Sequence, residues 1–275
     1  MIMDIHCHVL PEAVAQKTEE LFRARTGNKN IFDFSIKQLL KVMGSTVNKA
    51  FINNVVLRGD LVPRASDWVA EQVRQHPDRL VGMYSPHPDM AEHGRELERA
   101  FKELGFKGVK LNPSLMHYYP EDPRMRPFWE KANELKVPVL IHGGRNVEDF
   151  KVQKLDSARR FCEPNGFRPI IKAYPGIAFI LAHFAGAEDW WDIAVDVVTK
   201  NSNVYVDISM MGERLSPQTI TKYIKTVGAQ KVLYGSDYPG YDSNIEIAKL
   251  NALDLTDKEK KAILGENAVK VFKLN

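Results

Sequence analysis

Cysteine is scarce in this sequence, with only Cys7 and Cys162 among 275 residues. Two cysteines cannot build the disulfide framework of a small secreted domain, and they are typical of a protein from a reducing compartment. Long apolar runs are also absent: no stretch of about 18 apolar residues occurs, and Asp4, His6 and His8 interrupt the apolar character of the N-terminus. We therefore expect a soluble, cytoplasmic protein without a membrane partner.

The sequence also lacks an excess of charge of one sign. It carries 38 Lys and Arg residues against 35 Asp and Glu residues, a formal charge of +3, and these charges are mixed along the chain. Nucleic-acid binding calls for clustered basic residues with interleaved aromatics, and we find no such cluster. A glycine-rich phosphate turn does not follow the first apolar segment either, which argues against an open doubly wound nucleotide-binding sheet.

Eight short apolar segments, rich in β-branched residues, alternate with helical patterns. Such strands are typical of a parallel sheet covered by helices. We predict a (β/α)8 TIM barrel that forms a single domain over residues 1–275. The predicted strands are 3–9, 49–57, 80–84, 106–111, 138–142, 177–183, 204–209 and 232–237.

Residues able to do chemistry end several of these strands. In an extended strand His6 and His8 point to the same side, roughly 7 Å apart at Cα. Taken alone, the pair fits two hydrogen-bonded strand histidines as well as two metal ligands. Because active sites of barrels lie at the carboxyl ends of the strands, we expect the set to converge. The other strand-ending residues are Lys110, His142, His183 and Asp237.

The remaining residues of these types receive structural interpretations. Cys7 alternates with the two histidines, so we expect a packed, inert thiol outside the metal site. The other histidines lie in predicted helices or loops and are interpreted as ordinary surface or loop residues. They are His76, His87, His93 and His117.

Six motifs together resemble the amidohydrolase superfamily along essentially the whole chain. They are His6-x-His8, Gly108-Val-Lys-Leu-Asn-Pro113, Ile141-His142-Gly-Gly, Ala182-His183-Phe-Ala-Gly186, Tyr234-Gly-Ser-Asp237-Tyr-Pro and Ile263-Leu-Gly-Glu-Asn-Ala268. The sequence is most similar to the amidohydrolase-related group that includes aminocarboxymuconate-semialdehyde decarboxylase, resorcylate decarboxylases and dicarboxylate lactonases.

The resemblance implies a metal site and a catalytic histidine. His6, His8, His142 and Asp237 match the ligands of one divalent metal ion, with zinc expected first and manganese or iron as alternatives. His183 matches an acid/base or substrate-orienting residue beside the metal-bound water. Three imidazoles and one carboxylate would leave a coordination position open, and Asp237 or His183 could accept the proton of the bound water.

Cationic residues near strand ends are candidates for binding a substrate carboxylate. Lys110 is interpreted as an unmodified cation that holds an anionic substrate or a neighbouring carboxylate; the alternative is a carboxylated lysine that bridges two metal ions. Arg145 follows His142 and Arg58 follows the second predicted strand, and a guanidinium fork suits a carboxylate. An ordinary solvated arginine is the alternative for each.

The first functional hypothesis is a metal-dependent hydrolase of a small carboxylate-bearing ester, lactone or amide. The alternative is a metal-dependent non-oxidative decarboxylase of a small unsaturated or aromatic acid, which would use the same ligands. A third hypothesis is a barrel that keeps the ligands for binding or structure alone. We expect a small-molecule substrate and allow for a homo-oligomer, such as a dimer.

Overall fold

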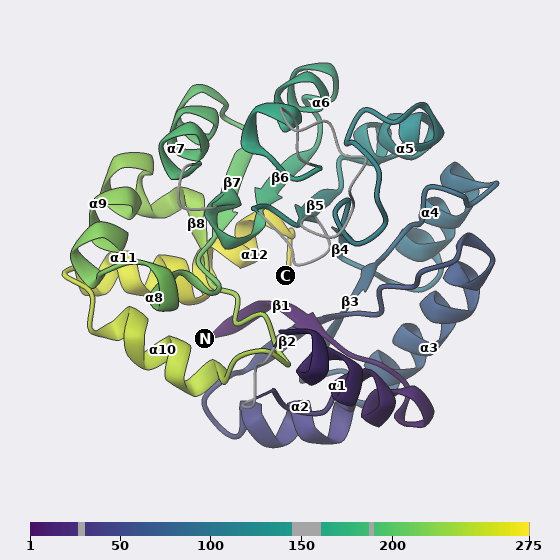
Figure 1. The fold of residues 1–275 in the computed structure, drawn as a ribbon, viewed down its shortest axis with the longest axis horizontal. Coiled ribbons are helices and arrows are strands. Elements are labelled where there is room, and N and C mark those ends of the chain that lie inside the picture. The colour runs from purple at the N-terminus through teal and green to yellow at the C-terminus, as the bar shows by residue number, and fades with distance from the viewer. Residues whose placement is uncertain (27–30, 145–160, 187–189, 275) are drawn as a thin grey trace. The chain divides into compact units, whose positions relative to one another are not determined.

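The strands follow the predicted order along the chain (Figure 1). The computed structural model describes residues 1–26, 31–144, 161–186 and 190–274. Neighbouring strands in the sequence are neighbours in the sheet, in the order β1 to β8, and the described pairings are parallel. This order, with helices between the strands, confirms the (β/α)8 TIM-barrel fold. The strands are β1 Met3–His8, β2 Lys49–Asn53, β3 Leu80–Tyr84, β4 Gly108–Leu111, β5 Pro138–Ile141, β6 Ala178–Leu181, β7 Val204–Asp207 and β8 Val232–Leu233.

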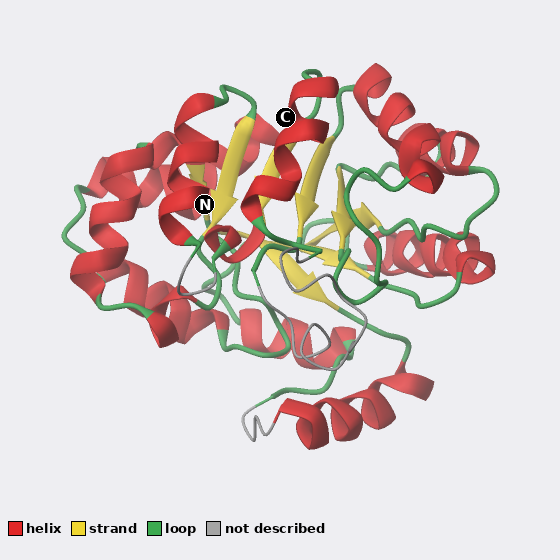
Figure 2. Ribbon diagram, turned by 45° about the horizontal axis from the view of Figure 1, so that its top comes forward, coloured by secondary structure: helices red, strands yellow, loops and turns green. Residues whose placement is uncertain are grey.

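Helices separate the strands along the chain (Figure 2). They are α1 Glu12–Thr26, α2 Ile36–Met43, α3 Val62–Gln75, α4 His93–Lys102, α5 Arg126–Leu135, α6 Arg168–Ala173, α7 Trp191–Lys200, α8 Met211–Arg214, α9 Pro217–Val227, α10 Ser243–Asn251, α11 Asp257–Lys261 and α12 Asn267–Val271. Local signals explain several starts: the Ser35 side chain caps α2 through the backbone N–H of Gln38, and Thr256 forms a capping box with Glu259. Across the described ranges, no helix has both the length and the apolar composition needed to cross a membrane.

The chain divides into two compact units. Unit 1 comprises Met1–Asn54, Trp68–Gly82 and Ile208–Asn275. In it β1 pairs with β2 from Met3 opposite Lys49 to His8 opposite Asn53. The segment that follows β8 also hydrogen-bonds to β1, because the backbone N–H of Ile5 donates to Tyr234 (3.1 Å) and that of His8 donates to Tyr238 (2.8 Å). Unit 1 therefore holds the first strand and the end of the last one together.

Unit 2 comprises Val55–Asp67 and Met83–Asp207. Its strands β4 to β7 pair in register and are almost entirely buried, as expected for strands of a parallel sheet covered by helices. One close approach depends on glycine: a Cβ at Gly143 would lie 2.4 Å from Cα of Ala185. Glycine at this position allows the chain after β5 to pack directly on the turn after β6. The prediction of a single domain over residues 1–275 stays a prediction.

Two element boundaries differ from the sequence prediction. The eighth strand was expected over 232–237, but β8 ends at Leu233 because the following residues leave the strand and Asp237 adopts a left-handed conformation (φ 64°). The sequence Ser66-Asp67 predicts a helix from there to Gln75 by its N-cap pattern, yet α3 begins at Val62, and the Ser66 hydroxyl donates to the carbonyl of Val62 inside the helix. Ser66 thus satisfies its hydroxyl within the helix and does not cap it.

Candidate active site

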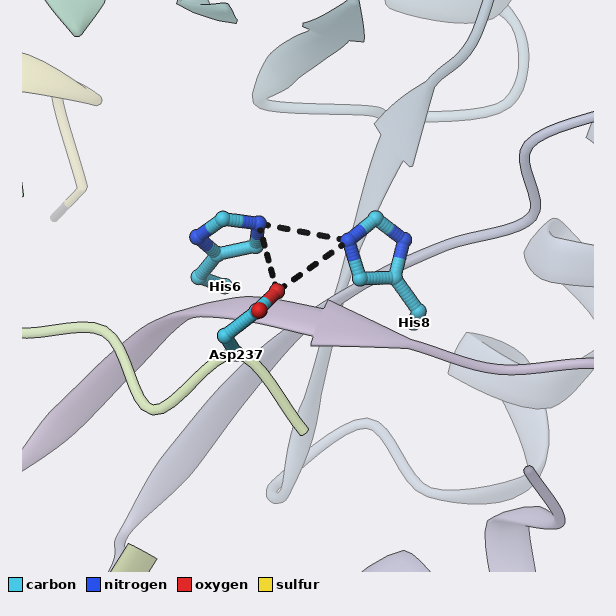
Figure 3. Close-up of side chains that lie close together, drawn as sticks. All are labelled: His6, His8 and Asp237. Carbon is cyan, nitrogen blue, oxygen red and sulfur yellow. Dashed lines mark hydrogen bonds and ion pairs between the residues drawn. The ribbon is translucent and has the colours of Figure 1, made fainter. Parts of the chain in front are cut away.

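Three of the four predicted metal ligands meet in unit 1. Nε2 of His6 lies 3.2 Å from Nε2 of His8 and 3.2 Å from Oδ1 of Asp237, and Nε2 of His8 lies 3.5 Å from the same oxygen. Figure 3 shows the two imidazoles and the carboxylate pointing toward one another from β1 and from the segment after β8. The His6 side chain is fully buried, while about a fifth of the His8 and Asp237 side chains remains exposed. One ligand of the cluster is thus shielded from solvent, and the other two are partly exposed to it.

Local backbone irregularities aim these side chains. Between Asp4 and Cys7 the chain advances by three residues on β1 while it advances by two on β2, from Ala50 to Ile52. Such a bulge carries one extra residue, and it re-aims the side chains near it. Asp237 has a left-handed backbone, which Asp tolerates better than most residues. Both ligand segments therefore depart from regular strand geometry where the ligands lie.

The donor set fits a divalent metal ion. Ligands that bind at about 2.1 Å in tetrahedral or octahedral geometry lie about 3.0 to 3.5 Å apart, which is the range observed here. Two imidazole nitrogens and a carboxylate oxygen suit zinc, manganese or iron(II). Oγ of Ser209 lies 3.4 Å from Nδ1 of His6. When His6 donates from Nδ1 to this oxygen, Nε2 keeps its lone pair for a metal.

The fourth predicted ligand, His142, belongs to unit 2, where it pairs with His183. Nδ1 of His142 lies 3.2 Å from Nε2 of His183. Both residues were predicted to end their strands; His142 instead directly follows β5, and His183 lies two residues after β6, in the turn Ala182–Ala185. A hydrogen bond between two imidazoles needs one donor and one acceptor nitrogen, so the tautomer or protonation of each ring constrains the other. This pair can hold and pass a proton.

His183 sits in a strained turn. His183, Phe184 and Ala185 all have positive φ angles, of 57°, 55° and 47°. Consecutive left-handed non-glycine residues are costly and persist only where surrounding contacts impose them. One such contact is the buried carboxylate of Asp207, which accepts a hydrogen bond of 2.8 Å from the backbone N–H of His183. The fold thus fixes the position of this imidazole.

The predicted substrate-binding residues have different surroundings. Lys110 is fully buried in β4, opposite Leu140 of β5. Arg58 is 69% exposed at its side chain, and its guanidinium forks onto the carboxylate of Asp60 at 2.6 and 3.0 Å. A substrate would have to compete with Asp60 for Arg58. Arg145 lies outside the described residues.

Sequence reasoning missed Asp4, Ser209 and Asp207. Asp4 is buried, and burial of its carboxyl raises the pKa to about 6, although hydrogen bonds to it oppose the shift. The available signal for Asp4 was its spacing of two from His6. For Asp207 the signal was a carboxylate at the end of an apolar strand, where such a group needs a partner.

One histidine interpretation is wrong. His93 was expected at the surface or in a loop, but it lies in α4 and is only 2% exposed, whereas His87 does lie in a loop, after β3, although it is buried (7% exposed). His93 falls on the buried face of α4 with Leu97 and Ala100, a spacing that the sequence displays. Cys7 is fully buried, and burial raises the pKa of its thiol, in agreement with a packed, unreactive side chain.

Comparison with known proteins gives a consistent set of relatives. A gamma-resorcylate decarboxylase from Polaromonas sp. is 26% identical over 250 residues, which are 77% of this chain and 76% of the relative. A 2-keto-4-carboxy-3-hexenedioate hydratase from Sphingobium sp. is 25% identical over 243 residues, 75% of this chain and 70% of the relative. A crystal structure of a dihydroxybenzoic acid decarboxylase from Polaromonas sp., with bound manganese and the inhibitor 2-nitroresorcinol, has the same fold. Its TM-score is 0.74 at 20% identity, with 100% of this chain and 97% of that chain covered.

The family assignment rests on a match to nearly the whole chain. The family model described as Amidohydrolase matches residues 3–274, a range that includes all the strands and every candidate residue discussed above. The chain belongs to this amidohydrolase family of enzymes.

Proposed function

We propose that this protein is a metal-dependent non-oxidative decarboxylase of a small aromatic or unsaturated carboxylic acid. The observation that carries the proposal is the convergence of His6, His8 and Asp237, in a chain that shares about three quarters of its length with a gamma-resorcylate decarboxylase. This order reverses the expectation from sequence, which put hydrolysis first. Two of the three proteins described above are decarboxylases, which favours the carboxy-lyase alternative.

His6, His8 and Asp237 are proposed to hold the metal ion, and His142 stays the predicted fourth ligand. When bound, the ion would supply positive charge that holds an acid substrate and stabilises the negative charge that develops as the bond to the carboxylate breaks. The manganese of the Polaromonas decarboxylase structure makes manganese the first ion to test beside zinc.

The chain's own residues must then supply a proton. Decarboxylation breaks the bond between the substrate carbon and its carboxylate, releases CO2, and leaves an electron pair that takes up one proton. His183 is the proposed donor because its backbone N–H is fixed by Asp207 and its buried imidazole shares a hydrogen bond with His142. The His142 contact would orient the His183 ring, and solvent would return a proton to His183 after each turnover.

Lys110 and Arg145 are proposed to favour the anionic substrate. Lys110 is fully buried, so the charge of its protonated amine would be screened little, and an unmodified lysine stays the preferred candidate over a carboxylated bridging lysine. Arg58 is the weaker candidate because its guanidinium pairs with Asp60. The expected cytoplasmic location stays a prediction, and a homo-oligomer, such as a dimer, stays allowed for.

A substrate panel tests the function. Purified protein loaded with Mn2+ or Zn2+ should release CO2 from one or more hydroxybenzoates or unsaturated dicarboxylic acids, with one solvent proton incorporated per CO2. Reactions run in H2 18O should leave the non-gaseous product free of 18O. Incorporation of 18O into the product without CO2 release, from a lactone, ester or amide, would establish the hydrolase alternative.

A further inference from the structure

Asp4, whose carboxylate is buried, hydrogen-bonds to the backbone of the segments that carry the candidate metal ligands in unit 1. Oδ1 of Asp4 accepts the backbone N–H of His6 at 3.2 Å and the backbone N–H of Ser236 at 2.9 Å. One of these residues is a proposed ligand, and the other immediately precedes the ligand Asp237. A single side-chain oxygen thus joins the two ligand-bearing segments, which are more than 200 residues apart in the sequence.

The Asp4 carboxylate accepts hydrogen bonds where the regular backbone hydrogen bonds between β1 and the segment after β8 are interrupted. Regular backbone hydrogen bonds join Ile5 to Tyr234 and His8 to Tyr238. Between these two bonds β1 advances by three residues and the opposite segment by four, so the two segments are out of step over this stretch. A buried N–H without an acceptor is costly, and Asp4 provides the acceptor on both sides.

The turn that carries Asp237 is held at both ends. Its left-handed residue is preceded by Ser236, whose N–H is bound by Asp4, and the Ser236 Oγ accepts the N–H of Tyr238 at 3.1 Å. Asp4, Ser236 and Tyr238 are all 1% exposed or less. The position of the Asp237 carboxylate therefore depends on a short network that begins at Asp4.

We propose that Asp4 is a positioning residue that sets the separation of the His6 and Asp237 ligands for metal binding. This inference rests on the proposed metal centre of the preceding section. Asp4 does not touch the ion in this proposal; it acts through the backbone of both ligand segments. Residues that orient metal ligands in this indirect way typically contribute 10–100-fold to metal affinity.

Two Asp4 variants and one control test the proposal. Asp4→Leu keeps the branched shape and removes both acceptors, while Asp4→Asn keeps one oxygen acceptor without the charge, and charged acceptors form the stronger hydrogen bonds. Asn267→Leu is the matched control in unit 1, because Asn267 is 2% exposed and its Nδ2 donates to the carbonyls of Ala229 (2.8 Å) and Val232 (2.7 Å), away from the ligands.

The measurement is the dissociation constant of Mn2+ by calorimetry, with the electron paramagnetic resonance spectrum of the bound ion and the melting temperature of the metal-free protein. We expect Mn2+ affinity to fall about tenfold to 100-fold in Asp4→Leu and about threefold to tenfold in Asp4→Asn, with an altered Mn2+ spectrum in both. Asn267→Leu should lower the melting temperature and leave the affinity and spectrum unchanged.

Three outcomes overturn the proposal. The first is an Asp4→Asn variant that binds Mn2+ with wild-type affinity and gives the wild-type Mn2+ spectrum. This result would overturn the proposal even if Asp4→Leu failed to fold. An equal loss of affinity in Asn267→Leu would show that general destabilisation is the cause. If the wild-type protein bound neither Mn2+ nor Zn2+, the metal centre of the proposed function would fall, and the role of Asp4 with it.

Discussion

His183 makes two hydrogen bonds within unit 2. Its backbone N–H is bound by Asp207 and its ring by His142. We expect His183→Ala to retain bound metal while kcat falls about 100-fold to 10,000-fold, the usual contribution of a positioned acid or base. Metal content by atomic spectroscopy and CO2 release by a coupled assay would check this.

Two further variants serve as comparisons with His183→Ala. His142→Ala should lose metal as well as turnover, and His76→Ala, on a half-buried residue at the end of α3, should change neither. Turnover that survives in His183→Ala would remove this residue from the acid/base role.

The buried imidazole of His93 is expected to make the stability of the folded protein depend on pH. Within the described part of the chain neither ring nitrogen makes a hydrogen bond of normal geometry, and burial lowers the pKa of the imidazole, an effect that the Pro88 carbonyl opposes only in part. Below about pH 6.5 the unfolded chain takes up a proton that the folded chain resists, so this residue makes stability fall as the pH drops through that value.

The variant His93→Met removes this proton uptake at nearly constant volume. We expect its free energy of unfolding, from urea titrations with chelator present, to decline less than that of the wild type between pH 7.5 and 5.5. At pH 7.5 it should match or exceed the wild type, because two buried polar atoms are gone. Parallel pH slopes for the two proteins would contradict the assignment.

At the scale of elements, the turn after β6 packs on the chain after β5. A methyl group at Gly143 would lie 2.4 Å from Cα of Ala185 and 2.7 Å from the carbonyl oxygen of Ala182, so the backbone would have to move. We expect Gly143→Ala to cost about 1–3 kcal/mol of stability and to reduce turnover by displacing His183. Gly166→Ala is the matched control, since no atom lies within 4 Å of the added methyl group. Equal urea midpoints for the two variants would argue against this packing constraint.

The strands were predictable from sequence because strands that are buried on both faces of a sheet consist of short, continuous runs of apolar residues. His8 does end β1 and His142 directly follows β5, whereas His183 lies two residues after β6 and Asp237 four residues after β8. The left-handed conformations of His183 and Asp237 were not predictable, since they are held by Asp207 and Asp4 from distant parts of the chain. The role of Asp4 was hidden for a related reason: strict alternation along β1 does not reveal the bulge.

At the scale of the whole molecule, metal binding should be coupled to stability. A ligand that binds only the folded state at 100 times its dissociation constant stabilises it by about 2.7 kcal/mol, which corresponds to roughly 5 °C or more in melting temperature. We expect chelator treatment to lower the melting temperature by about this amount, and Mn2+ or Zn2+ to restore it. Asp237→Asn should remove most of the metal-dependent part, because a neutral amide is a poorer ligand than a carboxylate. A melting temperature insensitive to chelator and to both ions would contradict the metal centre.

The irregular ladder between β1 and the segment after β8 also has a kinetic consequence. The amide hydrogens of His6 and Ser236 are bound by a side chain, yet they lie in the buried interior beside regular backbone bonds. Their exchange with solvent deuterium should therefore be as slow as that of the neighbouring strand amides, and it should accelerate selectively when Asp4 loses its charge. One buried carboxylate would then control how often the first and last strands of the sheet separate.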